Sequence, residues 1–362
     1  MLSNYFTASQ TDSVREFIQT AQHIVIVTHM SPDGDAMGSS LGMRHYLKHI
    51  GKTSITNIVP NSFPSFLAWM PDADKVIIYD EHQAEADAIL STCDLLICTD
   101  FNEPKRIGAL GDKIQNLACP KILIDHHLHP ANFADITLSF PSSPSASELV
   151  YRLVYAIETT ISSNKSASSI FSLEAAQCLY TGMMTDTGNF SFNSNHAEMY
   201  EIIGQLVALG VDKDAIYNAV FNAYSADRMR LMGYCLYQKM RIFPEHHVAL
   251  ICLSRKELYR FNFKSGDAEG IVNLPLQIND VYYSVFMRED KIETHEREKA
   301  NGAKSKIKLS FRSQGDRPVN VFASEVFSGG GHANAAGGEY YGTLPDAIQL
   351  FLDNYELYCK KI

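Results

Sequence analysis

The cysteines of this chain form no metal-binding motif. The 362 residues contain seven cysteines, at positions 93, 98, 119, 178, 235, 252 and 359, and no two of them form a Cys-x-x-Cys pair. An odd, unpatterned set of thiols in a chain of this length indicates reduced, mostly buried side chains and not a disulfide framework. We therefore expect a cytosolic setting and no zinc site built from cysteine.

Long apolar runs are also missing. No run of about 18 consecutive apolar residues occurs, so we expect no transmembrane helix. The first ten residues have neither a basic segment nor an apolar core, so they do not resemble a secretory signal. Apolar residues make up 46% of the chain and charged residues 20%, values typical of globular proteins. These features predict a cytoplasmic protein of two domains with no membrane partner.

Positive charge is in deficit. The chain has 31 Lys and Arg residues against 41 Asp and Glu residues, for a net charge of −10. Proteins that hold long nucleic acid non-specifically usually present a basic face. An anionic substrate must therefore be attracted by a local group of cations or by bound metal ions. This favours small or short anionic substrates over duplex DNA.

Strand-like runs alternate with helical patterns in the first part of the chain. Runs rich in Val, Ile and Leu predict strands at 23–27, 53–59, 76–79, 94–99 and 121–124. Amphipathic patterns predict helices at 12–22, 36–50 and 83–90. This alternation is typical of an α/β fold with a mostly parallel sheet and helices on both faces.

The pattern becomes helical after this sheet and then returns to mixed α/β. Helices are expected at 146–158, 173–183, 196–209, 213–221 and 226–237. Further strands are expected at 248–253, 281–286 and 306–311, and further helices at 267–274, 319–327 and 345–358. We predict a first domain at 1–225, a linker at 226–243 and a smaller α/β C-terminal domain at 244–362.

Three of the expected strands end in acidic or histidine residues. These residues are His29, Asp33 and Asp35 after the first strand, Asp100 after the fourth, and Asp125, His126 and His127 after the fifth. Alone, the first group is as compatible with an ordinary turn as with a site, Asp100 with a helix cap, and the Asp125–His127 group more with an exposed turn. The carboxyl ends of parallel strands meet at one edge of a sheet, where ligands bind in such folds. Their shared position therefore favours a metal site.

The second domain contains a glycine-rich segment, Ser328–Gly338, and an arginine after an expected strand, Arg312. Glycine-rich backbone exposes N–H groups that can hold phosphate oxygens, although a flexible tight turn is the alternative. The planar fork of arginine suits bidentate binding of phosphate, although a surface arginine is the alternative.

A run of charged residues without periodicity lies between Arg288 and Ser305. We interpret it as a solvated hairpin loop. The alternative is that it guides an anion through Lys299, Lys304 and Lys306.

Taken together, these motifs resemble the DHH phosphoesterase family, which is named for a triplet like Asp125-His126-His127. The other matching motifs are His29-x-x-x-Asp33-Gly-Asp35, Asp100 after an apolar strand, Asp186 after a helix, Ser310-Phe311-Arg312-Ser313, and Gly329-Gly330-Gly331-His332. The resemblance covers roughly residues 15 to 345. One departure is Ser328, where many members have a further glycine. Length and motif order most resemble the bacterial oligoribonuclease and pAp phosphatase group.

The resemblance implies two divalent metal ions and a set of site residues. It assigns one ion to His29, Asp33 and Asp100, and the other to Asp35, Asp100, His126 and Asp186. Such carboxylate and imidazole ligands suit Mn²⁺, with Mg²⁺ or Co²⁺ as alternatives. The implied catalytic residues are Asp100, Asp125 and His127. The implied substrate-binding residues of the second domain are Ser310, Arg312, Gly330, Gly331 and His332, with the active site in the cleft between the domains.

The implied activity is hydrolysis of short single-stranded RNA, dinucleotides or the nucleoside bisphosphate pAp by a hydroxide shared between the two ions. Alternatives are hydrolysis of pyrophosphate, polyphosphate or cyclic dinucleotides. A catalytically silent nucleotide sensor would predict losses among the six metal ligands, and none is missing. The helices after Asp186 either form a homodimer or pack on the sheet.

Overall fold

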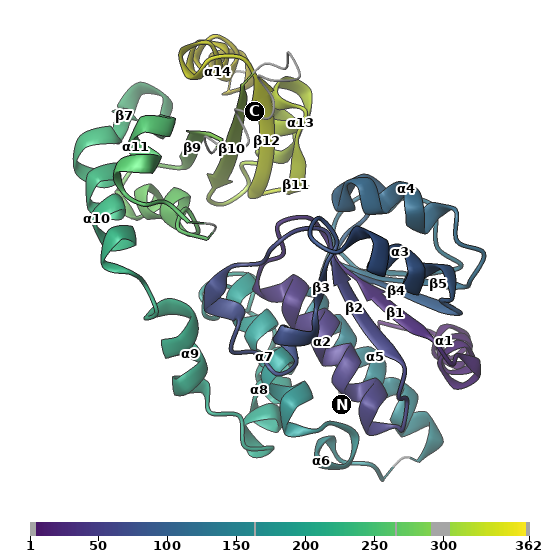
Figure 1. Ribbon diagram of the computed structural model, residues 1–362. Coiled ribbons are helices and arrows are strands. Elements are labelled where there is room, and N and C mark those ends of the chain that lie inside the picture. Colours follow the sequence, from purple (N-terminus) through teal and green to yellow (C-terminus); the bar gives the residue numbers. More distant parts are fainter. Residues whose placement is uncertain (1–4, 163, 265, 291–304, 360–362) are drawn as a thin grey trace. The chain divides into compact units, whose positions relative to one another are not determined.

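The computed structural model describes residues 5–162, 164–264, 266–290 and 305–359. The chain divides into two compact units, Met1–Ala223 and Tyr224–Ile362 (Figure 1). The expected linker at 226–243 coincides with helix α10 (Ala226–Tyr234), a π-helical turn and strand β7 (Arg241–Phe243). Leu231 and Cys235 in this stretch are buried in a core of the second unit, because their apolar side chains lie on one helical face.

A six-stranded sheet with the order β3-β2-β1-β4-β5-β6 forms the centre of the first unit. All neighbouring strands in it are parallel. The strands are β1 (Ile24–Val27), β2 (Ile55–Val59), β3 (Ile77–Ile78), β4 (Leu95–Thr99), β5 (Lys121–Asp125) and β6 (Ile136–Ser139). The predicted parallel sheet is confirmed, and β6 is an additional edge strand. Its sequence gave little signal because it is short and only one of its four residues is buried.

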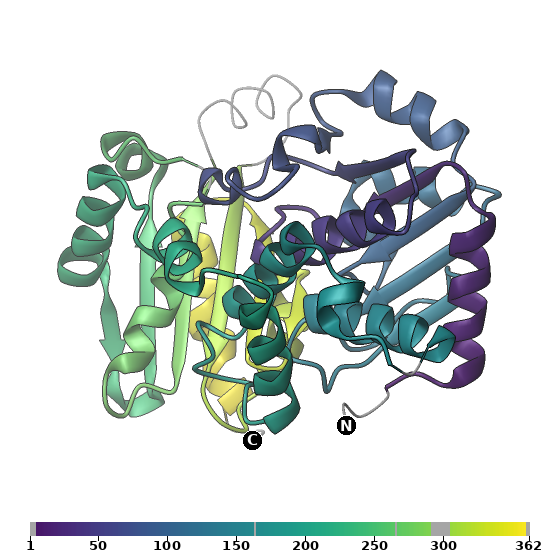
Figure 2. The ribbon, with the colours of Figure 1, turned by 90° about the horizontal axis from the view of Figure 1, so that it is seen from below.

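Helices cover both faces of this sheet (Figures 1 and 2). They are α1 (Ala8–Thr20), α2 (Gly34–His49), α3 (Gln83–Ser91), α4 (Ala109–Gln115), α5 (Ala146–Ile161), α6 (Ala167–Ile170), α7 (Leu173–Asp186), α8 (Ala197–Ala208) and α9 (Lys213–Phe221). Alternate residues of each strand face opposite layers. Ile24 and Ile26 pack with α1, α2, α5 and α7, whereas Val25 and Val27 pack with α3 and α4.

Helices α2 and α7 approach closely because glycines lie between them. A Cβ atom added at Gly38 would lie 2.7 Å from the carbonyl oxygen of Cys178. One added at Gly182 would lie 1.9 Å from Ser147 Oγ and 2.7 Å from Asp35 Oδ1. Only glycine leaves room for this contact, which brings the first turn of α2 and the last turn of α7 together.

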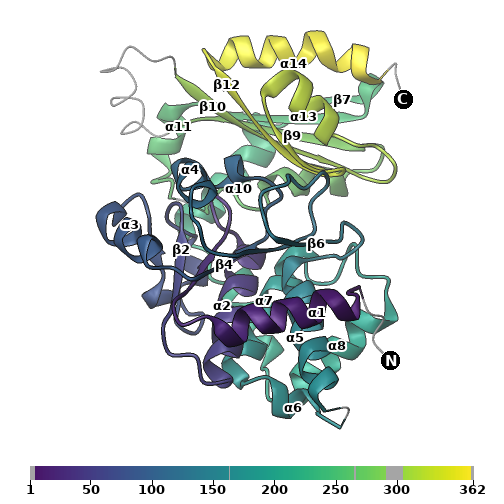
Figure 3. The same ribbon diagram turned by 90° about the vertical axis from the view of Figure 1, so that its right-hand side faces the viewer.

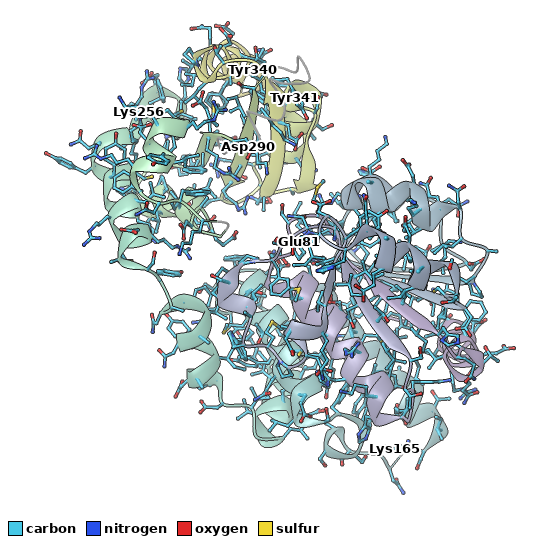
Figure 4. The ribbon with its side chains drawn as sticks, in the orientation of Figure 1. Glu81, Lys165, Lys256, Asp290, Tyr340 and Tyr341 are labelled. Carbon is cyan, nitrogen blue, oxygen red and sulfur yellow. The ribbon has the colours of Figure 1, made fainter. Side chains whose placement is uncertain are left out.

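The second unit contains a mixed sheet with the order β11-β12-β10-β9-β8-β7. Only β8 and β9 are parallel within it, and the other pairs are antiparallel. The strands after β7 are β8 (Val248–Leu253), β9 (Tyr283–Glu289), β10 (Lys306–Ser313), β11 (Gly330–His332) and β12 (Ala335–Tyr341). At the end of β12 the two labelled tyrosines differ, since Tyr340 packs against the core and Tyr341 is 51% exposed (Figure 4).

Helices cover both faces of the second sheet as well. Helices α13 (Asn320–Phe327) and α14 (Leu344–Cys359) pack on one face, where Figure 3 shows α14 lying across the strands. Helices α10 and α11 (Arg255–Arg260) and the 3₁₀ segment Ile271–Gln277 pack on β8 and β9 from the other face.

Two expectations for the second unit need correction. The alternative of a flexible tight turn at Ser328–Gly338 is wrong for most of the segment, which forms the antiparallel hairpin β11–β12. The helix expected at 267–274 is a 3₁₀ segment at Ile271–Gln277, and it contains Pro275, which does not fit an α-helix interior.

Two further expectations concern the charged run and the membrane. Arg288 belongs to β9 and Lys306 to β10, whereas Lys299 and Lys304 lie outside the described residues. Within the described part of the chain, none of the helices is long and apolar enough to span a bilayer.

Candidate metal centre

The candidate site lies where the strand order of the first sheet reverses. Strands β1 and β4 are neighbours, and the chain proceeds outward from them in opposite directions. Loops at the carboxyl ends of two such strands separate and leave a crevice in which ligands bind. His29 follows β1, and Asp100 follows β4 directly.

Helix α2 begins with two of the expected ligands. Asp33 is the N-cap, and its Oδ1 accepts hydrogen bonds from the backbone N–H groups of Asp35 and Ala36, each at 3.0 Å. The Asp35 carboxylate accepts hydrogen bonds from the backbone of Ala146 at 2.6 Å and Ser147 at 2.9 Å, at the start of α5. Asp35 is therefore buried against a helix N-terminus, which favours negative charge.

The remaining expected ligands come from β4, β5 and α7. Asp100 has a φ of +64°, a backbone conformation that costs energy for a residue other than glycine and often marks a functional site. Asp125 is the last residue of β5, and His126 and His127 follow it. Asp186 is the last residue of α7.

These side chains form two groups that share Asp100. In the first group, His29 Nε2 lies 3.4 Å from Asp100 Oδ2 and 3.7 Å from Asp33 Oδ1. In the second group, His126 Nε2 is the central atom. It lies 3.3 Å from Asp100 Oδ1, 3.5 Å from Asp186 Oδ2 and 3.8 Å from Asp35 Oδ2. Asp100 thus presents one oxygen to each group.

Backbone carbonyl groups fix the orientation of both central histidines. His29 Nδ1 lies 3.0 Å from the carbonyl oxygen of Met30, and His126 Nδ1 lies 3.1 Å from that of Ser143. A proton on Nδ1 satisfies each carbonyl and leaves Nε2 facing the carboxylates, where its deprotonated form can bind a cation. A metal-ligating histidine is commonly held in this way.

The carboxylates and histidines of the two groups perturb one another. Burial acts to lower the pKa of His29, but attraction by Asp33 and Asp100 raises it to about 10. Burial and the neighbouring carboxylates raise the pKa of Asp35 above its usual range. For Asp186, burial is the main cause of a pKa raised to about 7, and Asp33 and Asp100 add to it. The carboxylates therefore repel one another without a cation.

The donor set fits divalent metal ions. Asp33, Asp35, Asp100 and Asp186 supply four carboxylates, and the two histidines supply neutral nitrogen donors. Oxygen and imidazole donors without thiolate suit hard or borderline divalent cations. Asp100 Oδ1 is buried, and His126 Nε2 at 3.3 Å is the nearest donor that the described residues offer it, without the geometry of a regular hydrogen bond, as expected of an atom whose partner is a cation. Two divalent cations would balance the four negative charges.

A second histidine and an arginine lie beside these groups. Asp125 Oδ1 is 2.8 Å from His127 Nδ1, and its Oδ2 accepts a hydrogen bond from the His127 backbone at 3.0 Å. Arg106 Nη2 lies 3.1 Å from His127 Nε2. Burial lowers the pKa of His127, against the attraction of Asp125 and Asp100, so its neutral form is favoured. Both ring nitrogens of His127 are therefore engaged.

Arg106 is absent from the sequence-based set of site residues. It lies in the short 3₁₀ helix Pro104–Ile107 after β4, and its carbonyl oxygen accepts a hydrogen bond from the Met30 backbone at 2.8 Å. The signal that could have found it is its position six residues after Asp100, in the loop that follows a site strand. Nothing else in the sequence distinguishes Arg106 from the other charged residues near it.

The expected substrate residues of the second unit lie on one face of its sheet. Along β10 the residues alternate between buried and half-buried, and Ser310 and Arg312 are both half-buried. Ser310 pairs with Gly337, which pairs with Gly330 on β11, and Arg312 is connected to His332 in the same way through Ala335. Directly paired residues face the same side of a sheet. Gly331 pairs with Ala336 and points to the opposite side.

The fold and the carboxylate-histidine groups are those of a DHH phosphoesterase, and the chain belongs to this family of hydrolases. Residues 23–183 match the DHH family, N-terminal domain, and residues 248–361 match the DHHA1 domain. The first match contains the expected ligands up to α7 but ends three residues before Asp186.

Named relatives cover nearly the whole chain. A solved structure of an exopolyphosphatase-related protein from Bacteroides fragilis is 44% identical, covers 99% of each chain and has a TM-score of 0.88. The bifunctional oligoribonuclease and PAP phosphatase NrnA of Thermus thermophilus is 28% identical over 87% of this chain and 83% of its own. The protein of the same name from Bacillus subtilis is 22% identical over 93% of this chain and 95% of its own.

Proposed function

We propose that this chain is a manganese-dependent phosphoesterase that hydrolyses short oligoribonucleotides, dinucleotides and pAp. The observation that carries the proposal is the position of Asp100, whose two carboxylate oxygens lie 3.4 Å from His29 Nε2 and 3.3 Å from His126 Nε2. A carboxylate in this position suits a pair of ions that act on one phosphoryl group. A single structural ion would not need one histidine group at each oxygen of the Asp100 carboxylate.

Each carboxylate-histidine group is proposed to bind one divalent ion. His29, Asp33 and Asp100 would hold the first, and Asp35, His126 and Asp186 the second, with Asp100 added to it by its 3.3 Å distance to His126 Nε2. When bound, two such ions supply Lewis-acid stabilisation of the phosphoryl oxygens. The chain itself supplies the geometry: the Asp33 cap, the backbone contacts of Asp35 and the two carbonyl-bound histidines hold the ligands in place before any ion arrives.

Asp125, His127 and Arg106 are proposed to act on the substrate side of the reaction. Asp125 holds the proton of His127 on Nδ1, and Arg106 donates toward His127 Nε2. The guanidinium of Arg106 carries a fixed positive charge, which suits a phosphate oxygen or the leaving group. We therefore assign leaving-group and phosphate stabilisation to His127 and Arg106 together.

The second domain is proposed to bind the nucleotide through the sheet face that carries Ser310, Arg312, Gly330 and His332. Gly337 and Ala335 lie between them in the paired rows, so small side chains separate the polar ones. The polar side chains of such a face can form hydrogen bonds to a phosphate or a sugar. Placement of the active site between the two domains stays a prediction from the sequence, as do the cytoplasmic location and the homodimer.

A second candidate is hydrolysis of inorganic polyphosphate or pyrophosphate. It is favoured by the Bacteroides fragilis structure, which is described as exopolyphosphatase-related and is more similar in sequence than the two NrnA proteins. The nucleotide proposal is favoured by the two NrnA names. Cyclic dinucleotides are a third substrate class with the same phosphodiester chemistry.

The test is a comparison of substrates under one condition. Purified protein with Mn²⁺ is given a 5′-phosphorylated diribonucleotide, pAp, cyclic di-AMP, pyrophosphate and polyphosphate in parallel. We expect turnover of the first two and its loss in Asp100→Asn. Turnover of the inorganic substrates alone would reject the nucleotide proposal in favour of the second candidate.

A variant of the second domain adds a control for substrate binding. Arg312→Gln is expected to raise KM for the diribonucleotide by about 10-fold or more, because a charge-assisted phosphate contact is lost. Lys256→Gln, in α11 of the same domain, should leave KM unchanged. Equal KM values for the two variants would remove Arg312 from the proposed nucleotide site.

A further inference from the structure

Two half-buried cysteines contact each other at the start of the site strands. Cys93 lies two residues before β4, and Cys119 lies two residues before β5. Their sulfur atoms are 3.8 Å apart. Because β4 and β5 are paired neighbours, the two segments enter the sheet side by side. The candidate metal ligands leave the same two strands at their opposite ends.

The two thiols differ in environment. The sulfur atoms of Cys119 and Cys93 lie within hydrogen-bond distance, and Cys93 Sγ also lies 3.1 Å from the carbonyl oxygen of Leu95. When Cys119 is ionised, Cys93 can donate its proton to it, and this contact, supported by the charge of Lys121, lowers the pKa of Cys119 to about 7, although burial opposes this. A thiolate is the attacking form in disulfide exchange. Cys119 is therefore the nucleophile of the pair.

The other cysteines whose side chains the structure describes have a different environment. They are Cys98, Cys178, Cys235 and Cys252. All four are buried, and burial raises the pKa of each. Buried thiols with raised pKa values react slowly. Reactivity toward a thiol oxidant should therefore concentrate at the Cys93–Cys119 pair.

We propose that Cys93 and Cys119 form a site of reversible thiol–disulfide exchange with small-molecule disulfides. The Cys119 thiolate attacks one sulfur of the small disulfide, so that a mixed disulfide forms and one small thiolate leaves. Cys93 then loses its proton and attacks Cys119 Sγ, which forms the Cys93–Cys119 bond and releases the second small thiolate. The protein loses two hydrogens, and the small disulfide is reduced to two thiols.

The bond would stabilise the first domain with little effect on catalysis. It would join segments that the β4–β5 pairing already holds together, so the ligand loops at the far ends of these strands need not move. It would also close a loop between residues 26 positions apart, which restricts the unfolded chain. The oxidised protein should therefore melt at a higher temperature than the reduced protein.

The experiment treats the full-length protein with oxidised glutathione, alkylates the remaining thiols under denaturing conditions and measures intact and peptide masses. After alkylation, the oxidised wild type should carry five alkyl groups where the reduced protein carries seven. We also expect a linked pair of peptides carrying Cys93 and Cys119, and reversal by dithiothreitol. Cys93→Ser should stop at a glutathione adduct on Cys119. Cys119→Ser should form neither the disulfide nor a glutathione adduct at position 119. Cys252→Ser should form the Cys93–Cys119 disulfide as the wild type does.

Thermal melting gives an independent readout. The oxidised wild type should melt at a higher temperature than the reduced form, and this shift should disappear in Cys93→Ser. The proposal is overturned if the wild type retains both thiols after treatment. It is equally overturned if the wild type accumulates only glutathione adducts, or if the linked peptides carry a different pair of cysteines.

Discussion

The two domains each contain a six-stranded sheet, yet they present functional side chains in different ways. The first sheet is all parallel, so its carboxyl ends bring charged loops to one edge, where they are buried and close together. The second sheet is mixed and presents half-buried residues such as Ser310 and Arg312 on alternate positions of a strand. The first arrangement concentrates like charges in clusters that could hold metal ions, whereas the second spreads polar groups along a strand.

The largest effect is expected from the carboxylate shared by the two groups. Asp100→Asn keeps the shape of the side chain but removes its charge. Loss of a residue that only hydrogen-bonds to a metal ligand typically lowers activity by about 10- to 100-fold. We expect a larger loss of activity in Asp100→Asn. Steady-state kinetics with saturating Mn²⁺ measure it. A variant of Asp112, an acidic residue of the first turn of α4, controls for charge alone.

The close contact of α2 and α7 should be nearly as sensitive. In Gly182→Ala the new Cβ would meet Ser147 Oγ and Asp35 Oδ1, so Asp35 must move. We expect weaker metal binding and a loss of about 1–3 kcal/mol of stability, as for other overpacked sites. Gly204→Ala is the matched control, because an added Cβ there meets nothing within 4 Å. Equal metal affinity in both variants would contradict the role of this contact.

The arginine beside His127 should have an intermediate effect. Arg106→Gln removes the donor to His127 Nε2, and we expect kcat to fall by about 10- to 100-fold. Arg106→Lys should recover part of the loss, because it restores the charge but not the planar fork. Lys105→Gln, at the exposed neighbouring position, should be neutral. If Arg106→Gln behaves like Lys105→Gln, the arginine has no part in the reaction.

How far the sequence predicts the molecule also differs between the domains. Strands β1, β4 and β5 are continuous runs of buried aliphatic residues, and such runs are recognisable without a structure. Because they are parallel neighbours, the groups that follow them could be expected to meet. The sequence could not predict which nitrogen of each histidine faces the carboxylates, because this depends on distant carbonyl groups such as that of Ser143.

The second domain was harder to predict for physical reasons. Strands β11 and β12 are rich in glycine, which has a low strand propensity, so local sequence favoured a loop. Pairing with β10 stabilises them instead, and that pairing is a tertiary effect. Arg106 was missed in the first domain for the same reason, since nothing local indicates its contact with His127.

Smaller effects should distinguish the domains by their response to pH without metal. The folded first domain raises the pKa of Asp186 to about 7 and of His29 to about 10, and also raises those of Asp35 and His126. A carboxyl group whose pKa is raised in the folded domain contributes stability that is lost as the pH rises from 3.8 toward its folded pKa. A histidine whose pKa is raised in the folded domain contributes stability that is present below pH 6.5 and lost as the pH rises toward its folded pKa. The free energy of unfolding of the metal-free domain should therefore fall as the pH rises from about 5 to about 9, because the folded domain holds these protons more tightly than the unfolded chain.

The second domain should lose stability as the pH falls into the acid range. Burial acts to raise the pKa of Glu257, but hydrogen bonds from Lys239 and Tyr234 lower it to about 2. Its contribution is therefore present above 4.5 and lost as pH falls toward 2. Hydrogen exchange read by peptide mass reports each domain separately. Glu257→Gln should reduce protection in the second domain by about 1 kcal/mol and leave the first domain unchanged. Metal addition should flatten only the response of the first domain.

The most direct test of the account is the number and coupling of the metal ions. Metal-free protein is titrated with Mn²⁺, and binding is followed by calorimetry and by electron paramagnetic resonance. We predict two ions per chain, magnetically coupled through the Asp100 carboxylate, and loss of the coupling in Asp100→Asn. A single ion per chain, or two ions without coupling, would contradict the shared role of Asp100.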